Sequence, residues 1–224
     1  SSPGPPRLPR RAKPPYCASV PDRYPSILLF GPPGVGKGTQ GKILGMIPGF
    51  FHLATGDMFR SLDKESELGA EFHRYSSQGL LVPDELTIRL WQQHVAQLVS
   101  RGLYTAGRDV LLLDGIPRSV AQAEAMHDYI DVLLVVHMIA GDLDEMVRRM
   151  QKRATEQGRT DDADDAVIRR RFEVYELETS PVLGAYEASL IAPVDGLGTP
   201  AEVLLRILQA IVPSVAKSGA KPTV

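Results

Sequence analysis

A glycine-rich loop constrains the possible fold of this 224-residue chain more than any other segment. The run GPPGVGKGTQ occupies residues 31–40 and directly follows the apolar residues 27–30. Glycine lets the backbone turn its N–H groups inward around a polyphosphate, and a helix after such a loop directs its positive N-terminus at the same anion. Lys37 supplies a cation for the β- and γ-phosphates, and Thr39 is the hydroxyl expected near Mg²⁺. The order of strand, loop and helix predicts a nucleotide-binding α/β core.

Short apolar runs alternate with longer helical stretches along the rest of the core. This alternation is typical of a parallel sheet that carries helices on both faces. We therefore expect an α/β fold, a phosphate-loop core with a five-stranded parallel sheet. The five expected strands are residues 27–30, 51–54, 110–113, 132–137 and 190–194.

Two helix starts are marked by residues that cap helix N-termini. Asp142 is followed three residues later by Glu145, and Thr199-Pro200 is followed by Glu202. Both patterns have an N-cap side chain and a reciprocal acidic partner. They predict helices that begin near residues 143 and 200.

Composition excludes several classes of function. The net charge of −2 gives no sequence-independent attraction to nucleic acid. Cys17 is the only cysteine, so neither an internal disulfide nor a multi-cysteine zinc site forms, and we expect a reducing, cytoplasmic setting. The longest apolar runs, 110–113 and 132–136, fall far short of the roughly 20 residues that span a bilayer. We therefore expect no membrane crossing.

The ends of the chain differ from its core. The first 25 residues hold eight prolines, five Lys or Arg and one acid, so we expect a disordered arm over 1–25 rather than an organellar presequence, whose amphipathic helix the prolines would break. Residues 213–224 suggest a flexible tail. Between them, we expect a domain over 26–212 with two lobes, about 55–84 and about 155–166, inserted at the carboxyl edge of the sheet.

The chain resembles the adenylate kinases, within the nucleoside monophosphate kinases, segment by segment. The loop has that family's form G-P-P-G-x-G-K-G-T-Q, in which Gly38 stands where the generic loop has Ser or Thr. Further matches are ATGDMFR, GLLVPDEL, LLLDGIPRSVAQAE, RRMQKRATEQGRTDD and RRRFEVYELETSPVLGAYE, at 54–60, 79–86, 111–124, 148–162 and 169–187. Together they cover about residues 26 to 210. The resemblance implies reversible phosphoryl transfer from Mg-ATP to AMP, giving two ADP.

The resemblance also assigns roles to individual residues. It assigns AMP binding to Thr55, Gly56, Arg60, Leu81, Val82, Gly115, Arg118, Gln122, Arg159 and Arg171. It assigns ATP binding to Gly34, Val35, Gly36, Lys37, Gly38, Thr39, Arg149 and Arg153. Magnesium is expected through Thr39 and Asp114, mostly by way of water. The charges expected to act on the transferring phosphoryl group are Lys37, Arg118, Arg153, Arg159 and Arg171.

Three of the acceptor-side assignments also make chemical sense alone. Arg118 offers a planar fork suited to a phosphate, and Gln122, four residues on, has a donor and an acceptor for a base edge. Arg60 lies one helical turn after Gly56. Thr55 and Ser119 favour AMP over the acceptors of the related UMP/CMP kinases, which carry alanine and asparagine there.

The charged segment after residue 148 resembles the short form of the family's lid, without a zinc site. Arg149 and Arg153 are four residues apart, so both reach one side of a helix. The spacing from Arg159 to the next lid arginine is one residue longer than usual. Counting forward selects Arg170, whereas alignment on the following aromatic residues selects Arg171, which we prefer.

The expected mechanism relies on positioning and charge, because a phosphate acceptor needs no strong general base. Water would compete with AMP, so we expect the lobes to close over both substrates and their motion to limit turnover. The partners expected are ATP and AMP, with the protein a monomer. The alternatives are a UMP/CMP kinase and a non-catalytic adenine-nucleotide sensor.

Overall fold

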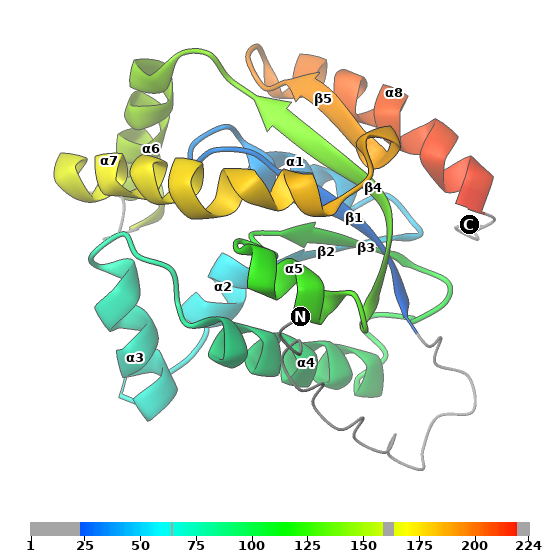
Figure 1. Cartoon of the computed structure of the whole chain (residues 1–224), viewed down its shortest axis with the longest axis horizontal. Coiled ribbons are helices and arrows are strands. Elements are labelled where there is room, and N and C mark those ends of the chain that lie inside the picture. Colours follow the sequence, from blue (N-terminus) through cyan, green and yellow to red (C-terminus); the bar gives the residue numbers. More distant parts are fainter. Residues whose placement is uncertain (1–22, 64, 159–163, 219–224) are drawn as a thin grey trace, which may run out of the picture.

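A single parallel sheet forms the centre of the computed structural model, which describes residues 23–63, 65–158 and 164–218. Its strands are β1 (Tyr24–Phe30), β2 (Phe50–Ala54), β3 (Val110–Asp114), β4 (Ile130–Ile139) and β5 (Ile191–Asp195), in the order β2-β3-β1-β4-β5 (Figure 1). All pairings are parallel. The predicted fold class and all five predicted strands are therefore confirmed, with boundaries that shift by one to three residues.

The sheet reverses its direction of growth at β1. Leu29 pairs with Asp114 of β3 on one side and with Val136 of β4 on the other. In open α/β sheets, ligands bind beyond the carboxyl ends of the strands at such a switch point. The loop after β1 lies there.

Helices cover both faces of the sheet and extend past its carboxyl edge (Figure 1). They are α1 (Lys37–Leu44), α2 (Thr55–Arg60), α3 (Glu67–Ser76), α4 (Asp84–Ser100), α5 (Val120–Met126), α6 (Leu143–Gln157), α7 (Asp165–Val174) and α8 (Pro200–Ser218). One π-helical turn, η2 (Tyr175–Thr179), and two 3-10 helices, η3 (Ser180–Ala185) and η4 (Ala188–Leu190), connect α7 to β5. In the described part of the chain, no helix is both long and apolar enough to cross a membrane.

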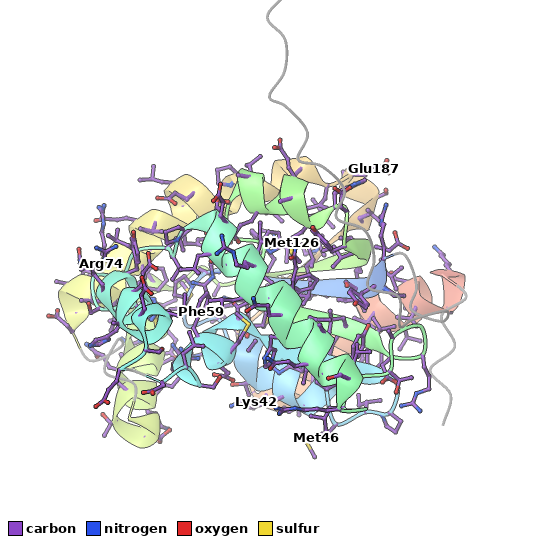
Figure 2. All side chains as sticks on the ribbon, turned by 90° about the horizontal axis from the view of Figure 1, so that it is seen from below. Lys42, Met46, Phe59, Arg74, Met126 and Glu187 are labelled. Carbon is purple, nitrogen blue, oxygen red and sulfur yellow. The ribbon has the colours of Figure 1, made fainter. Side chains whose placement is uncertain are left out.

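Alternate residues of the central strands enter two separate cores. One set, including Ile27 and Val136, packs against α1, α6, α7 and α8. The other, including Leu28 and Val135, packs against α4, α5 and the turn at Tyr175. Both faces are apolar because both are covered. In Figure 2, the labelled Met126 lies among packed side chains, whereas Met46 points away from the fold and is 82% exposed.

A third, smaller core belongs to the stretch predicted as an inserted lobe. Met58 and Phe59 of α2 pack with Leu90 of α4, and Phe72 of α3 stacks on Phe59 at 4.9 Å between ring centres. This cluster is distinct from the two sheet cores. Helices α2 and α3 thus carry an apolar anchor of their own beside the carboxyl edge of the sheet.

Both predicted N-caps are confirmed. The Asp142 carboxylate accepts a hydrogen bond from the Glu145 N–H at 2.9 Å, at the start of α6. At the start of α8, the Thr199 hydroxyl accepts from the Glu202 N–H, and the Glu202 carboxylate accepts from the Thr199 N–H at 2.7 Å. This is the reciprocal capping box that the spacing predicted.

Several predicted boundaries were wrong. Helix α1 begins at Lys37, inside the loop motif rather than after it. Strand β1 includes Tyr24 and Pro25, the last two residues of the predicted arm. Helix α8 continues through Pro213 to Ser218, where we predicted a tail, and Val215 is buried against the sheet core. Residues 1–22 and 219–224, the remainder of the predicted arm and tail, lie outside the described residues.

Packing explains why a proline is accommodated in α8. Residues at four-residue intervals, Val203, Ile207, Ile211 and Val215, face the same core. Burial of such a stripe stabilises a helix by roughly 1.5–3 kcal/mol per large side chain, whereas an internal proline costs about 3 kcal/mol. The apolar stripe therefore outweighs the local preference of Pro213.

Candidate active site

The glycine loop wraps closely around neighbouring backbone. Gly31 and Gly34 both have positive φ, and a Cβ at Gly34 would lie 2.8 Å from the Met146 carbonyl oxygen. The side chain of Val35 is buried in the core and anchors the loop. The shape of the loop therefore requires glycine at residues 31 and 34, because a larger residue would be strained and would collide with the neighbouring backbone.

Lys37 is the first residue of α1, and its side chain points back into the glycine loop. Its Nζ donates hydrogen bonds to the carbonyl oxygens of Gly31 at 2.7 Å and Pro32 at 2.9 Å. Burial lowers the pKa of Lys37 to about 8, with Arg118 and Arg171 adding to the decrease and Asp114 opposing it. The ammonium group is thus already close to the positive charges of more distant segments.

Asp114 ends β3 beside the loop. Its Oδ2 would lie 3.4 Å from a Cβ at Gly38, and it lies 3.9 Å from Nε2 of His52. Burial alone would raise the pKa of Asp114, but His52, Lys37 and Arg118 outweigh it and hold that pKa below its ordinary value. A carboxylate here fits Mg²⁺, which keeps several waters and takes one or two protein carboxylates. Thr39 is exposed on the first turn of α1.

The ring of His52, on β2, packs directly against α1. A Cβ at Gly41 would overlap this ring, so only glycine fits at that position. The helix after the loop therefore approaches the sheet closely.

A pocket beside the loop collects residues from most of the predicted acceptor site. Ten residues that the sequence singled out line it, namely Lys37, Thr55, Gly56, Arg60, Leu81, Val82, Gly115, Arg118, Gln122 and Arg171. The aromatic rings of Phe59, Phe72 and Tyr175 also line it, and these were not predicted. The loop residues Gly34, Val35, Gly36, Gly38 and Thr39 and the arginines Arg149 and Arg153 are not among its described lining residues.

Hydrogen bonds between distant segments hold the floor of this pocket. The Thr55 hydroxyl donates to the Gly115 carbonyl oxygen at 2.8 Å, and Arg118 Nε donates to the same oxygen at 2.9 Å. The Thr179 hydroxyl donates to the Arg118 carbonyl oxygen at 2.9 Å. The ends of β2, β3 and the turn η2 are thereby joined around Arg118.

Gln122 and Arg60 have partners within the protein. The side chain of Gln122, almost fully buried, accepts from the Arg118 N–H at 2.8 Å and donates to Asp84 at 2.7 Å. Arg60 pairs with Asp57 at 2.6 Å, and both side chains are partly exposed. Asp84 was missed in the sequence analysis, because nothing in the sequence alone pairs residues 38 positions apart.

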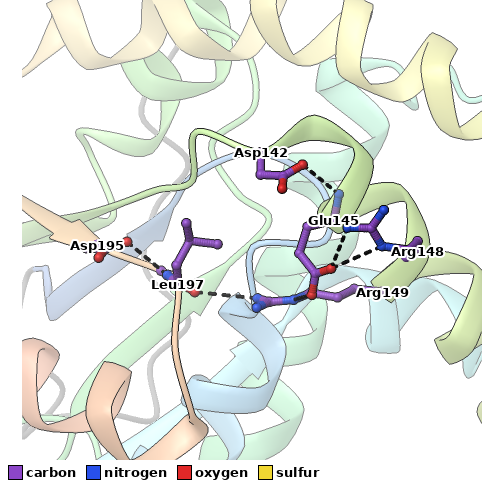
Figure 3. A network of polar contacts seen from close by, with 7 residues as sticks. Asp142, Glu145, Arg148, Arg149, Asp195 and Leu197 are labelled. Atoms are coloured by element: carbon purple, nitrogen blue, oxygen red, sulfur yellow. Dashed lines mark hydrogen bonds and ion pairs between the residues drawn. The ribbon is translucent and has the colours of Figure 1, made fainter.

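Two arginines of α6, Arg148 and Arg149, pair with the same acidic residue of that helix. Glu145 accepts from both Arg148 and Arg149 at 3.0 Å, and Arg149 also reaches the Gly196 carbonyl oxygen at 3.5 Å (Figure 3). Arg153, farther along α6, is close enough to Lys37 to lower its pKa. Arg159 lies outside the described residues.

The two candidate arginines of α7 have different surroundings. Arg171 lines the pocket and contributes to the low pKa of Lys37. Arg170 is exposed and pairs with Glu173 at 2.9 Å on its own helix. The geometry therefore favours Arg171 for a role at the pocket.

The fold has a glycine loop at the switch point of a parallel sheet, a partly buried lysine and carboxylate beside it, and an adjoining arginine-lined pocket. Together these features define a phosphate-loop protein built to hold phosphorylated nucleotides.

Comparison with known proteins narrows this class. The family model for adenylate kinase matches residues 29–191. An adenylate kinase of Kocuria rhizophila is 42% identical over 192 residues, covering 83% of this chain and 97% of the relative. Adenylate kinases of Thermus thermophilus (39% over 192 residues, 83% and 96%) and Clavibacter michiganensis (40% over 203 residues, 88% and 96%) are similar to the same extent. The chain belongs to the adenylate kinase family.

Proposed function

We propose that this protein is a phosphotransferase that moves the γ-phosphoryl group of Mg-ATP reversibly onto AMP, giving two ADP. The observation that carries the proposal is the pocket in which Arg118 and Arg171 meet Lys37 of the glycine loop. Acceptor and donor phosphates need this arrangement, since the two polyanions repel each other unless cations lie between them.

In this proposal, the acceptor occupies the pocket floored by Thr55 and Gly115. Arg118 and Arg60 bind the AMP phosphate, with Arg60 leaving Asp57 to do so. Leu81 and Val82 contact the base, and Gln122 hydrogen bonds to its edge. A charge-assisted bond to phosphate contributes roughly 1.5–3 kcal/mol, so exchange of a partly exposed ion pair for such a bond is favourable.

The donor occupies the loop. The N–H groups of Gly34 to Thr39 bind its phosphates, and Lys37 exchanges the Gly31 and Pro32 carbonyl oxygens for phosphate oxygens. Thr39 and Asp114 hold the hydrated magnesium ion, which neutralises phosphate charge when bound. Arg149 and Arg153 reach the donor from α6.

Catalysis then consists of alignment and charge stabilisation. Lys37, Arg118, Arg153 and Arg171 stabilise the negative charge that spreads over the transferring group, and the attacking phosphate oxygen needs no base. We propose that movement of the helices around the pocket excludes water and limits turnover. We also propose that the protein acts as a monomer in the cytoplasm, which size-exclusion chromatography with light scattering and fractionation of cells would check.

An acceptor panel tests the function directly. Formation of ADP from Mg-ATP would be measured with AMP, CMP or UMP as the acceptor, and we expect AMP to be used with the highest kcat/KM. Arg118→Ala should weaken AMP binding by roughly 10- to 100-fold and ATP binding far less, because in the ground state it removes a charge-assisted contact to the AMP phosphate.

The other possible results of these assays would point to a different function or a different role for Arg118. Preference for CMP or UMP would indicate a UMP/CMP kinase. Tight binding of ATP and AMP without product would indicate a nucleotide sensor. Equal loss of both nucleotides in Arg118→Ala would contradict its assignment to the acceptor.

A further inference from the structure

We propose that Asp84 is a positioning residue that fixes the orientation of the Gln122 amide, and that this orientation selects acceptors whose base carries an amino group beside a ring-nitrogen acceptor. The inference rests on the proposed function, because it concerns the acceptor base in the same pocket. Asp84 itself is not among the residues described as lining that pocket.

The two partners of Gln122 allow one orientation only. Asp84 Oδ1 lies 2.7 Å from Nε2 of Gln122, and the Arg118 backbone N lies 2.8 Å from its Oε1. A carboxylate only accepts hydrogen bonds, and a backbone N–H only donates them. A flipped amide would face oxygen to oxygen at Asp84 and N–H to N–H at Arg118.

Asp84 is held in place by a second residue. Its Oδ2 accepts from the Ser119 hydroxyl at 2.8 Å, and that hydroxyl oxygen accepts from the Gln122 backbone N–H at 3.0 Å. The three residues therefore form a closed ring of hydrogen bonds between the starts of α4 and α5. Because both carboxylate oxygens have partners, rotation of Asp84 would break one of these bonds.

The fixed amide presents a defined pattern to a ligand. One lone pair of Oε1 and one N–H of Nε2 remain after the two protein bonds are counted. An acceptor base must therefore place a donor opposite Oε1 and an acceptor opposite Nε2. Adenine offers its 6-amino group and N1, and cytosine offers its 4-amino group and N3. Hypoxanthine, guanine and uracil offer the reverse order, a carbonyl oxygen and a ring N–H.

Burial gives this pattern its discriminating power. The residue Gln122 is only 2% exposed, so water has little access to hydrogen bond to a mismatched edge. A site whose buried polar groups are left unpaired by a ligand rejects that ligand strongly. Inosine monophosphate is the sharpest probe, because it differs from AMP only in the 6-position group and the proton on N1.

The test compares AMP with inosine monophosphate in matched variants. Asp84→Leu replaces both carboxylate oxygens by methyl groups with little change in shape, and Asp84→Ala removes the side chain beyond Cβ. Glu85→Ala is the control, since Glu85 is an exposed acid in the same first turn of α4. The kcat/KM ratio for the two acceptors would be measured for each protein with Mg-ATP as the donor.

We expect the preference for AMP to fall by roughly tenfold in both Asp84 variants and to stay unchanged in Glu85→Ala. The preference should not vanish, because the Arg118 N–H still favours the original amide orientation. An equal loss of activity toward both acceptors, as a purely structural role would produce, would overturn the proposal, as would an unchanged ratio.

The ratio is insensitive to the fraction of protein that folds, since both acceptors are measured on the same sample. If Asp84→Ala does not fold, the nearly isosteric Asp84→Leu still decides the question. Lack of AMP phosphorylation by the wild-type chain would instead contradict the proposed function, whereas an active enzyme with an unmoved ratio would contradict only the role of Asp84.

Discussion

The two ends of the candidate active site are held in different ways. At the acceptor end, hydrogen bonds join residues far apart in the sequence, such as Thr55 to Gly115 and Thr179 to Arg118. On α6 and α7, the ion pairs of Arg148, Arg169 and Arg170 join residues three or four positions apart on one helix, at the surface. Each such surface pair contributes about 0–1 kcal/mol.

This difference separates a fixed half from an adjustable half. The pocket floor cannot shift without breaking bonds between strands and helices of the core. Arg148, Arg169 and Arg170 can exchange partners at little cost, since their ion pairs are exposed and local. We infer that the floor of the pocket is organised before a ligand binds, whereas the exposed arginines of α6 and α7 can change partners.

The largest effect is expected from replacement of Arg171, which lies on α7 and also lines the pocket. Arg171→Ala should lower kcat by roughly 10²- to 10³-fold, because it removes a charge that stabilises the transferring group. Arg170→Ala is the matched control, since Arg170 is exposed and paired with Glu173, and should change kcat by less than about twofold. Steady-state kinetics on both variants would decide. A larger loss in Arg170→Ala would assign the role to the other residue.

A smaller effect follows from the protonation of Lys37. Its pKa is about 8 in the free protein, mainly because of burial, and bound phosphates should raise that pKa by their negative charge. Binding is then favoured below pH 8 and weakens as the pH rises above it. Between pH 7 and pH 9, ATP affinity should fall by up to about tenfold.

Calorimetric titration of ATP over this pH range would measure the effect. Lys37→Met should bind more weakly and with no such dependence, because it has no proton to lose. A wild-type affinity that stays constant from pH 7 to pH 9 would contradict the assignment of Lys37 to the donor phosphates.

The smallest expected effect compares two arginines that share Glu145. Arg149 is partly buried and reaches Gly196, whereas the side chain of Arg148 is 64% exposed. Arg149→Ala should raise the KM for ATP by roughly three- to tenfold, and Arg148→Ala should leave it unchanged. Equal effects from the two substitutions would show that α6 acts through its overall charge rather than through one contact.

Sequence reasoning located the fold and the residues of one pocket well, because both depend on patterns that are contiguous in the sequence. The apolar runs defined all five strands, and the motifs around Thr55 and Arg118 identified residues that share one pocket. Strand and motif signals are local, so a single sequence contains them.

Features that depend on tertiary contacts could not be predicted from the sequence. Asp84 acts on Gln122 from 38 residues away, and no local pattern connects them. Counting along the chain left Arg170 and Arg171 open, since one residue of spacing turns a helix by about 100° and only the fold decides which side chain meets the pocket. At Pro213, burial of the apolar stripe of α8 outweighs the low helix propensity of proline.

The contact between Gly41 and His52 links two positions that any redesign of the protein must treat together. The imidazole fills the volume that a methyl group at residue 41 would require, so the two positions constitute one steric unit. Chimeras assembled from related kinases should inherit both residues from the same parent. A library that diversifies residue 41 alone should contain mainly destabilised variants, unless a smaller side chain is offered at residue 52 in the same molecule.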